Sequence, residues 1–253
     1  SNNQIIKYVK QQFPHVYKAR NLAAIISKSE ILLYLDDDII PYNNLVYEHL
    51  KNYKNGEIDA VVGMVKSKGW KPIASPFNFL KYTPEKQAFE YYPFVNRLDR
   101  IAFMYAGNFS IKKNVLFRIG GWDEHILTYG DRDLGLRLFK ANYKIVYDPE
   151  CIIFHINAST GGTRLSDPGA IWKSWERCVS IFYIAFKYLK GWMFIKYGLY
   201  RAARFTFLLK RNLLKPYIIP IEMFGYIKAF FIAYKWSKEG VKSSLINRDK
   251  CLL

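Results

Sequence analysis

An apolar run that ends in consecutive aspartates places the strongest constraint on how this chain can fold. Residues 31–35 are apolar and rich in branched and aromatic side chains, a composition typical of a buried strand. Asp36, Asp37 and Asp38 follow the run directly. These carboxylates cannot all lie in an apolar core, because burying unpaired charge costs too much free energy. The sequence therefore predicts a strand whose end faces solvent, a cation or both.

The position of the aspartates indicates what they could bind. In an open α/β sheet, ligands bind outside the carboxyl ends of the strands. Clustered carboxylates there suit a hard divalent cation such as Mg²⁺ or Mn²⁺, and such a cation suits a phosphorylated substrate. A plainer interpretation stays open for the triplet alone, since acidic residues after a strand also cap helices or solvate turns.

Patterns along the rest of the chain predict a mixed α/β sheet flanked by helices. Helices are expected over residues 3–12, 19–27, 113–118 and 131–140, and from Asn43 or Asn44 to about residue 54. Strands are expected over residues 31–35, 58–65, 101–105, 144–147 and 152–155. Residues 66–97 are rich in proline and aromatic residues and predict a long irregular loop, which at that length is usually functional.

The basic charge of the chain is concentrated in its last third. Residues 171–253 hold 16 basic and 4 acidic residues and so contribute +12 to the net charge of +17. The same stretch is rich in Trp, Tyr and Phe, and this combination favours an anionic membrane surface as a partner. Nucleic acid is the competing partner for such a charge. We therefore divide the chain into an α/β domain over residues 1–170 and a helical region over residues 171–253.

An amphipathic helix is expected within that helical region. It contains no run of 18 uncharged apolar residues, so no clean membrane-spanning helix is predicted. Lysines recur every seven residues, and aromatic and aliphatic side chains lie off that stripe: Lys228, Lys235 and Lys242 against Phe224, Ile227, Phe230, Phe231 and Tyr234. This pattern predicts a helix that lies on a membrane surface. Packing on the α/β domain and an oligomer interface stay open as alternatives.

A second acidic cluster marks the start of the predicted helix over residues 131–140. Asp131 and Asp133 both lie in its first turn, where carboxylates interact favourably with free backbone amides and the helix dipole. Capping accounts for one of them, and Asp133 can pair with Arg137 one turn later. Asp131 is then free to face a cleft as a general base.

Three further features complete the set of candidates. The segment Gly120-Gly121-Trp122-Asp123-Glu124 permits a tight bend or a close approach to a ligand. His155 ends a predicted strand, where it could serve as a metal ligand. Arg164 lies in a Gly-rich loop and suits bidentate contact with phosphate. Each has a plain structural alternative. The glycine segment could be a common turn, His155 could be a structural residue with satisfied hydrogen bonds, and Arg164 could be an exposed loop cation.

Taken in order, these motifs resemble the family 2 glycosyltransferases of GT-A fold. The resemblance covers roughly residues 15–180 and rests on Ala19-Arg20-Asn21, residues 35–41, Gly107-Asn108, residues 120–124, residues 131–137 and His155. It implies a GT-A-like sheet, a nucleotide-sugar donor and a divalent cation, Mn²⁺ or Mg²⁺, that bridges the donor's diphosphate. The segment from Asp36 to Asp38 then corresponds to the family's Asp-x-Asp motif.

The resemblance also implies a role for each matching residue. Metal binding falls to Asp38 and His155, and deprotonation of the acceptor hydroxyl falls to Asp131. Donor binding is implied for Arg20, Asp36, Asp37, Gly107 and Arg164. Trp122 and Asp123 are expected near the acceptor. A base acting directly on the acceptor implies inversion at the anomeric carbon.

The chain departs from the family pattern in two places. Gly130 stands where members commonly have a glutamate before the catalytic aspartate. The family's domain normally opens with a strand and a helix that hold the nucleotide base, whereas this chain begins at about the helix that follows them. We therefore expect an N-terminally truncated version of the fold.

These expectations combine into one function. The chain is expected to be an inverting, metal-dependent hexosyltransferase on the cytoplasmic face of a membrane, with a glycan or lipid-linked acceptor and no nucleic-acid partner. The widely spaced cysteines, which form no paired motif, fit a reducing compartment. The main alternative is a non-catalytic, membrane-bound binding or assembly module derived from the same fold. A basic nucleic-acid-binding protein is the weaker alternative.

Overall fold

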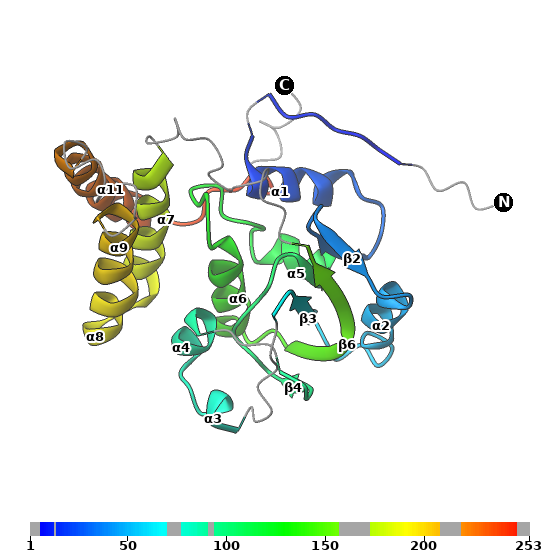
Figure 1. The fold of residues 1–253 in the computed structure, drawn as a ribbon. Coiled ribbons are helices and arrows are strands. Elements are labelled where there is room, and N and C mark those ends of the chain that lie inside the picture. The colour runs from blue at the N-terminus through cyan, green and yellow to red at the C-terminus, as the bar shows by residue number, and fades with distance from the viewer. Residues whose placement is uncertain are drawn as a thin grey trace.

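The structure, a computed structural model, describes residues 6–12, 14–69, 77–90, 94–156, 173–207 and 219–246. Over these residues the chain forms a six-stranded mixed sheet with helices around it, and a group of C-terminal helices lies to one side (Figure 1). This arrangement confirms the mixed α/β fold and the C-terminal helical region expected from the sequence.

The strands of the sheet run in both directions. They are β1 (Ile31–Leu35), β2 (Ile39–Pro41), β3 (Ala60–Ser67), β4 (Leu98–Asp99), β5 (Asn108–Lys112) and β6 (Ile145–His155). The order across the sheet is β1-β5-β3-β6-β2, and β4 pairs with β6 off this path. The pair β3 and β6 is parallel, and every other pair among the described strands is antiparallel.

A bulge in β6 changes the direction of the sheet. The register between β3 and β6 shifts after Gly63, where Asp148 is followed by Ile152 as the next paired residue of β6. The strand is strongly curved as a result (Figure 1). Its first half pairs with β4 and its second half pairs with β2. The bulge thereby brings the end of β6 beside β2, the short strand that follows the aspartates.

Helices cover the sheet and continue beyond it. They are α1 (Val16–Ile26), α2 (Leu45–Lys51), α3 (Phe77–Leu80), α4 (Pro84–Phe89), α5 (Lys113–Arg118), α6 (Gly130–Lys140), α7 (Lys173–Tyr188), α8 (Gly191–Met193), the π-helix η2 (Phe194–Tyr200), α9 (Arg201–Phe207) and α11 (Ile219–Glu239). The alternation along β3 shows how the two faces of the sheet are filled. Ala60, Val62 and Met64 pack into the larger core, and Val61 packs into a smaller core with Leu45 of α2.

Most of the predicted elements are confirmed with small shifts at their ends. These are the strand over residues 31–35, the strand near 58–65, and the helices near 19–27, 44–54, 113–118 and 131–140. The two strands predicted over 144–147 and 152–155 are one bulged strand, β6. The irregular region over 66–97 includes the short helices α3 and α4 within its described part.

Two predicted elements are wrong. Residues 6–12 of the helix expected over 3–12 are not helical, and residues 1–5 lie outside the described part. Ile6 and Tyr8 are exposed there, so a helix would have no core to pack on, and tertiary packing supplies most helical stability in proteins.

The strand expected over 101–105 also does not form. Residues 101–104 are buried in the larger core, but they join no strand ladder. The backbone N–H of Ile101 donates to the Ile145 carbonyl, and that of Ala102 donates to the Gln87 side chain. The next strand is instead β5, which begins at Asn108.

The C-terminal helices are joined to the α/β region by buried charges. Lys187 of α7 lies 3.2 Å from Asp123 and 2.7 Å from Asp133 of α6, and all three side chains are largely or fully buried. Tyr183 and Tyr188 also donate hydrogen bonds to these carboxylates. The boundary expected at residue 170 lies outside the described residues. Over the described residues, no helix is long and apolar enough to cross a bilayer.

A polar contact also joins distant parts of the chain beside α1. The Asn21 side chain donates to the Trp122 carbonyl at 2.9 Å, to Glu124 at 2.8 Å and to the Ser243 hydroxyl at 3.2 Å. Glu124 in turn accepts a hydrogen bond from the backbone of Ser244. Hydrogen bonds of this buried asparagine therefore hold the segment after α11 against α1.

Candidate active site

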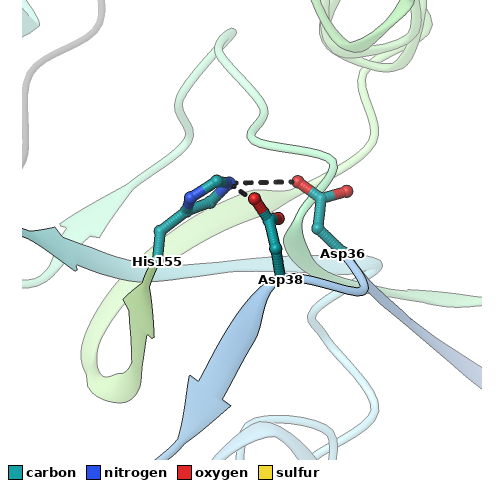
Figure 2. Close-up of side chains that lie close together, drawn as sticks. All are labelled: Asp36, Asp38 and His155. Atoms are coloured by element: carbon teal, nitrogen blue, oxygen red, sulfur yellow. Dashed lines mark ion pairs between the residues drawn. The ribbon is translucent and has the colours of Figure 1, made fainter. Parts of the chain in front are cut away.

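Two carboxylates and one imidazole converge at the carboxyl end of β1. Figure 2 shows Asp36, Asp38 and His155 with their polar ends turned toward one another. The Nε2 atom of His155 lies 3.7 Å from Asp36 Oδ2 and 3.4 Å from Asp38 Oδ1. One ligand atom from each residue lies within 4.8 Å of the others. His155 is buried and the two aspartates are half-buried, so the cluster forms a partly enclosed group of ligands.

The strand register explains why these residues meet. The turn after β1 leads directly into β2, which pairs antiparallel with the end of β6, so that Ile39 faces His155. The backbone N–H of Ile156 donates to the Asp38 carbonyl at 2.9 Å and closes the same corner. Residues more than a hundred positions apart are thus brought together by ladder pairing and by the bulge in β6.

The cluster fits a divalent cation. Bonds of about 2.1 Å from a metal ion to two ligands allow those ligand atoms to be up to about 4.2 Å apart, and both imidazole–carboxylate distances lie inside that limit. Carboxylate oxygens suit Mg²⁺ and Mn²⁺, and imidazole favours the transition metal of the two. Of these two ions the donor set suits Mn²⁺ better, and Asp36, Asp38 and His155 are the residues that could hold it.

Arg20 of α1 holds one carboxylate of the cluster. Its Nη2 atom donates to Asp36 Oδ1 at 3.1 Å and to the Ala106 carbonyl at 3.4 Å. The guanidinium also lies over the Trp122 ring, 4.9 Å from its centroid. Charge pairing and stacking together fix the guanidinium, which then fixes the orientation of Asp36.

Gly107 lies against the same carboxylate. A Cβ atom at this position would be only 2.3 Å from Asp36 Oδ2 and 2.7 Å from the Tyr105 ring. The backbone N–H of Asp36 also donates to the Gly107 carbonyl at 3.4 Å. The absence of a side chain at residue 107 is therefore what leaves room for the Asp36 carboxylate.

Asp131 lies at the start of α6. Its Oδ1 atom accepts a hydrogen bond from the backbone N–H of Arg132 at 2.9 Å. Burial raises the pKa of the Asp131 carboxyl above its usual range, and the charges of Arg132 and Arg20 only partly offset this effect. Contacts through Tyr17 connect this end of α6 with the cluster. Arg20, which donates to Asp36, lies 5.7 Å from the centroid of the Tyr17 ring, and the Tyr17 hydroxyl accepts a hydrogen bond from the backbone of Gly130, next to Asp131.

Tyr17 of α1 shapes the beginning of α6 and explains one departure from the family pattern. The backbone N–H of Gly130 donates to the Tyr17 hydroxyl at 2.6 Å. A Cβ atom on Gly130 would be 2.5 Å from the Tyr17 ring. A glutamate cannot occupy residue 130 while Tyr17 fills this space. The position of the Tyr17 ring therefore requires a glycine at residue 130.

The remaining predicted site residues lie in different surroundings. Asp37 is exposed on the turn after β1. The Trp122 side chain is completely buried, with its ring stacked on Tyr17 at 5.5 Å, and it supports Arg20 from within the core. Asp123 is also completely buried, in the charge network with Lys187. Arg164 lies outside the described residues.

Two residues beside the site were not among the predicted ones. Tyr17 contacts the start of α6, and Tyr105 packs edge-on against His155 with ring centroids 6.4 Å apart. Neither has a chemical group that marks it as functional in a linear sequence. The only available signal was proximity in the chain: Tyr17 lies three residues before Arg20, and Tyr105 lies two before Gly107.

No protein-family model matches the chain, and no curated protein matches it. Among solved structures it is similar to GalNAc-T7 with UDP, GalNAc and Mn²⁺, at 15% identity and a TM-score of 0.45, over 66% of this chain and 34% of that one. It is also similar to the mannosyltransferase PcManGT from Pyrobaculum calidifontis in complex with GDP-Man and Mn²⁺, at 14% identity and a TM-score of 0.45.

That second match covers 96% of this chain and 59% of the mannosyltransferase. The chain therefore spans only part of the length of either solved protein. Likenesses of this degree assign no family and no activity, and any functional conclusion must come from the site itself.

Proposed function

We propose that the protein is a metal-dependent glycosyltransferase that moves a sugar from a nucleotide-sugar donor to an acceptor hydroxyl, with inversion at the anomeric carbon. The observation that carries this proposal is the joint placement of two groups. A group of possible cation ligands, Asp36, Asp38 and His155, is linked through Arg20 and Tyr17 to the start of α6, where the half-buried carboxylate of Asp131 has a raised pKa.

Each group has a defined chemical task in such a transfer. Asp131 accepts the proton of the acceptor hydroxyl as that oxygen attacks the anomeric carbon, and its raised pKa makes it a better base than an ordinary aspartate. Arg20 keeps the Asp36 carboxylate in place. A cation held by the cluster would neutralise the charge that develops on the diphosphate leaving group. A single displacement, in which the base and the leaving group lie on opposite faces of the sugar, inverts the anomeric centre.

The surface of α11 supports a membrane location for this activity. Its buried side consists of Gly225, Ala229, Ala233 and Glu222. Apolar side chains point away from the fold on the other side: Ile221, Met223, Phe224, Ile227, Phe231 and Tyr234 are all exposed. Lys228 and Lys235 are exposed beside them. A helix with aromatic and basic groups on its outer side suits an anionic membrane surface, and we place the protein on the cytoplasmic face of a membrane, where it would act on a lipid-linked or surface glycan acceptor.

Metal and nucleotide binding test the first half of the proposal. Titration calorimetry with Mn²⁺ and a panel of nucleoside diphosphates should show metal-dependent binding of one nucleotide. Asp38→Asn should lose Mn²⁺ binding, because it removes one of the ligands. Asp99→Asn is the matched control, since Asp99 is an exposed aspartate on β4. Unchanged Mn²⁺ affinity in Asp38→Asn, or no nucleotide binding under any condition, would overturn the metal-dependent donor site and favour a non-catalytic module.

The base is tested separately. Asp131→Asn keeps the shape of the side chain and its position at the start of α6, but it cannot accept a proton. We expect this variant to bind metal and donor as the wild type does and to lose sugar transfer by a factor of about 10²–10⁴. Full transfer activity in Asp131→Asn would remove this residue as the base.

A further inference from the structure

Two arginines and a tyrosine form a stack beside Asp131. Arg132 of α6 and Arg201 of α9 both contact the Tyr129 ring, with their guanidinium carbons 4.3 Å and 5.0 Å from its centroid. Arg132 also lies 5.0 Å from the centroid of Phe89. The stack therefore joins the first turn of α6 to a helix of the C-terminal region.

The two guanidiniums carry more positive charge than the neighbouring carboxylate of Asp131 offsets. Over the described part of the chain, neither Arg132 nor Arg201 forms an ion pair, whereas Arg20, Arg97 and Arg137 each do. Burial lowers the pKa of Arg132, and the charge of Arg201 lowers it further. Two like charges held together in a half-buried setting cost free energy unless an anion offsets them.

The backbone at Tyr129 adds an independent sign of a constrained site. Tyr129 has a φ of +68°, in the left-handed region that non-glycine residues rarely adopt. It is the residue before α6 and makes no side-chain cap to that helix. Such a conformation costs of order 1 kcal/mol or more and is found preferentially at functional sites. Here the unfavourable backbone belongs to the residue whose ring both guanidiniums contact.

We infer that Arg132 and Arg201 bind a phosphate group of the acceptor substrate, so that the hydroxyl attacked by the sugar belongs to a phosphorylated molecule. This inference rests on the proposed function. Arg132 directly follows Asp131, and a phosphate bound there lies next to the base. Two guanidiniums on one ring match the charge of about −1.5 to −2 on a phosphate monoester, and arginine favours bidentate contact with phosphate oxygens.

Anion binding without metal tests the inference directly. Inorganic pyrophosphate is titrated into the protein in the presence of a chelator, so that the carboxylate–imidazole cluster holds no cation. We expect Arg132→Gln and Arg201→Gln each to weaken binding at least tenfold. Arg204→Gln, which removes an exposed arginine of the same helix α9, should bind as the wild type does. Arg20→Gln distinguishes the two possible sources of phosphate: if it alone abolishes binding, the anion site belongs to the donor and the inference is wrong.

A measurement on the unaltered protein covers the case in which a variant does not fold. Phenylglyoxal modifies accessible guanidiniums, and peptide mass spectrometry shows which ones have reacted. Pyrophosphate should protect Arg132 and Arg201 and should leave Arg204 reactive. Equal modification of all three with and without pyrophosphate would overturn the inference.

A measurement of Mn²⁺ binding distinguishes failure of this inference from failure of the proposed function. Both arginine variants should keep wild-type Mn²⁺ affinity, because neither contacts the cluster. Mn²⁺ binding that persists without any anion binding at the stack would leave the proposed function standing and remove the acceptor phosphate. Anion binding at the stack with no Mn²⁺ binding would remove the metal-dependent donor site instead.

Discussion

At the scale of single residues, the environment of Asp131 decides what this carboxylate can do. It lies half-buried at the start of α6, near Arg20 and Arg132, and burial outweighs both charges in setting its pKa. The same burial that disfavours its charged form at neutral pH makes it a stronger proton acceptor. The property that suits it to the proposed role as a base and its cost to the fold therefore have one origin.

A shifted pH profile follows from that environment. Asp131 accepts a proton only when it is ionised, and the ionised fraction falls as the pH decreases through its raised pKa. We therefore expect the acid limb of kcat/KM to lie above the pKa of an ordinary aspartate, which is about 3.9. The profile is measured at two saturating Mn²⁺ concentrations, because protonation of a metal ligand would move the limb with metal concentration. A limb at or below the ordinary value would contradict the assignment.

Gly107 gives a second prediction at this scale. An added methyl group would lie 2.3 Å from Asp36 Oδ2, so Gly107→Ala must displace this carboxylate from the cluster. We expect Mn²⁺ affinity to fall by about 10–100-fold, as for other changes that reorient a metal ligand. Mn²⁺ titration followed by electron paramagnetic resonance measures the effect. Gly63→Ala serves as a contrast, because its new methyl would instead meet Asn108 and the Cys151 carbonyl, and loss of stability is the expected result.

At the scale of the elements, the buried charges between α6 and α7 hold the candidate site in position. Lys187 is the cation between Asp123 and Asp133, and both carboxylates are completely buried. Burial opposes the ionisation of both. Hydrogen bonds from His125 and the charge of Lys187 nevertheless hold the pKa of Asp123 below its usual range, and the charges of Arg137 and Lys187 do the same for the pKa of Asp133. The network thereby fixes α6, whose first turn holds Asp131, against the C-terminal helices.

Removing the central cation should destabilise the whole fold. Lys187→Met keeps the length of the side chain but leaves Asp123 and Asp133 with one cation fewer. We expect the free energy of unfolding in urea to fall by about 3–5 kcal/mol, the usual cost of breaking a buried ion pair. Lys190→Met removes an exposed lysine that lies just after the same helix and should change the stability little. Equal stability of the two variants would show that the network contributes nothing.

The elements also show how far the sequence could be interpreted unaided. The strand before the aspartates was predictable from its run of apolar residues. The helix after Tyr129 was predictable from the acidic residues in its first turn. The proximity of Asp36 to Arg20 was expected only through the family resemblance. The meeting of Asp38 with His155 depends on the bulge in β6 and on the pairing of β2 with β6. Likewise, residues 101–104 form no strand, and the backbone N–H groups of Ile101 and Ala102 donate to Ile145 and Gln87. Such long-range contacts leave no periodic signal in the chain.

At the scale of the whole molecule, the outer side of α11 determines what the protein can contact. Phe224 and Phe231 are 70% and 65% exposed, although they lie on a helix that packs closely on α7 through small residues. Gly225 makes this approach possible, since a Cβ there would be 3.0 Å from Trp175. The close packing on one side leaves the large apolar groups on the other side exposed.

Vesicle binding tests this surface. We expect the protein to sediment with vesicles that contain anionic lipid, and less so as salt is raised. Phe224→Ser combined with Phe231→Ser should weaken that binding at least tenfold, since each buried aromatic group contributes about 1.5–3 kcal/mol. Lys54→Ser is a suitable control, because it removes an exposed charge after α2 in the α/β region. Unchanged sedimentation of the double variant would exclude this side of α11 as the membrane surface.

The fastening of Asn21 to Ser243 has a consequence for how the protein is made. A ribosome adds about 5–20 residues per second, and the first helix emerges long before the segment that it must contact. Asn21 is adjacent to Arg20, and its contacts with Trp122, Glu124 and Ser243 span up to 222 positions. The contact of Asn21 with Ser243 can therefore form only after residue 243 has been synthesised, whereas its contacts with Trp122 and Glu124 can form earlier.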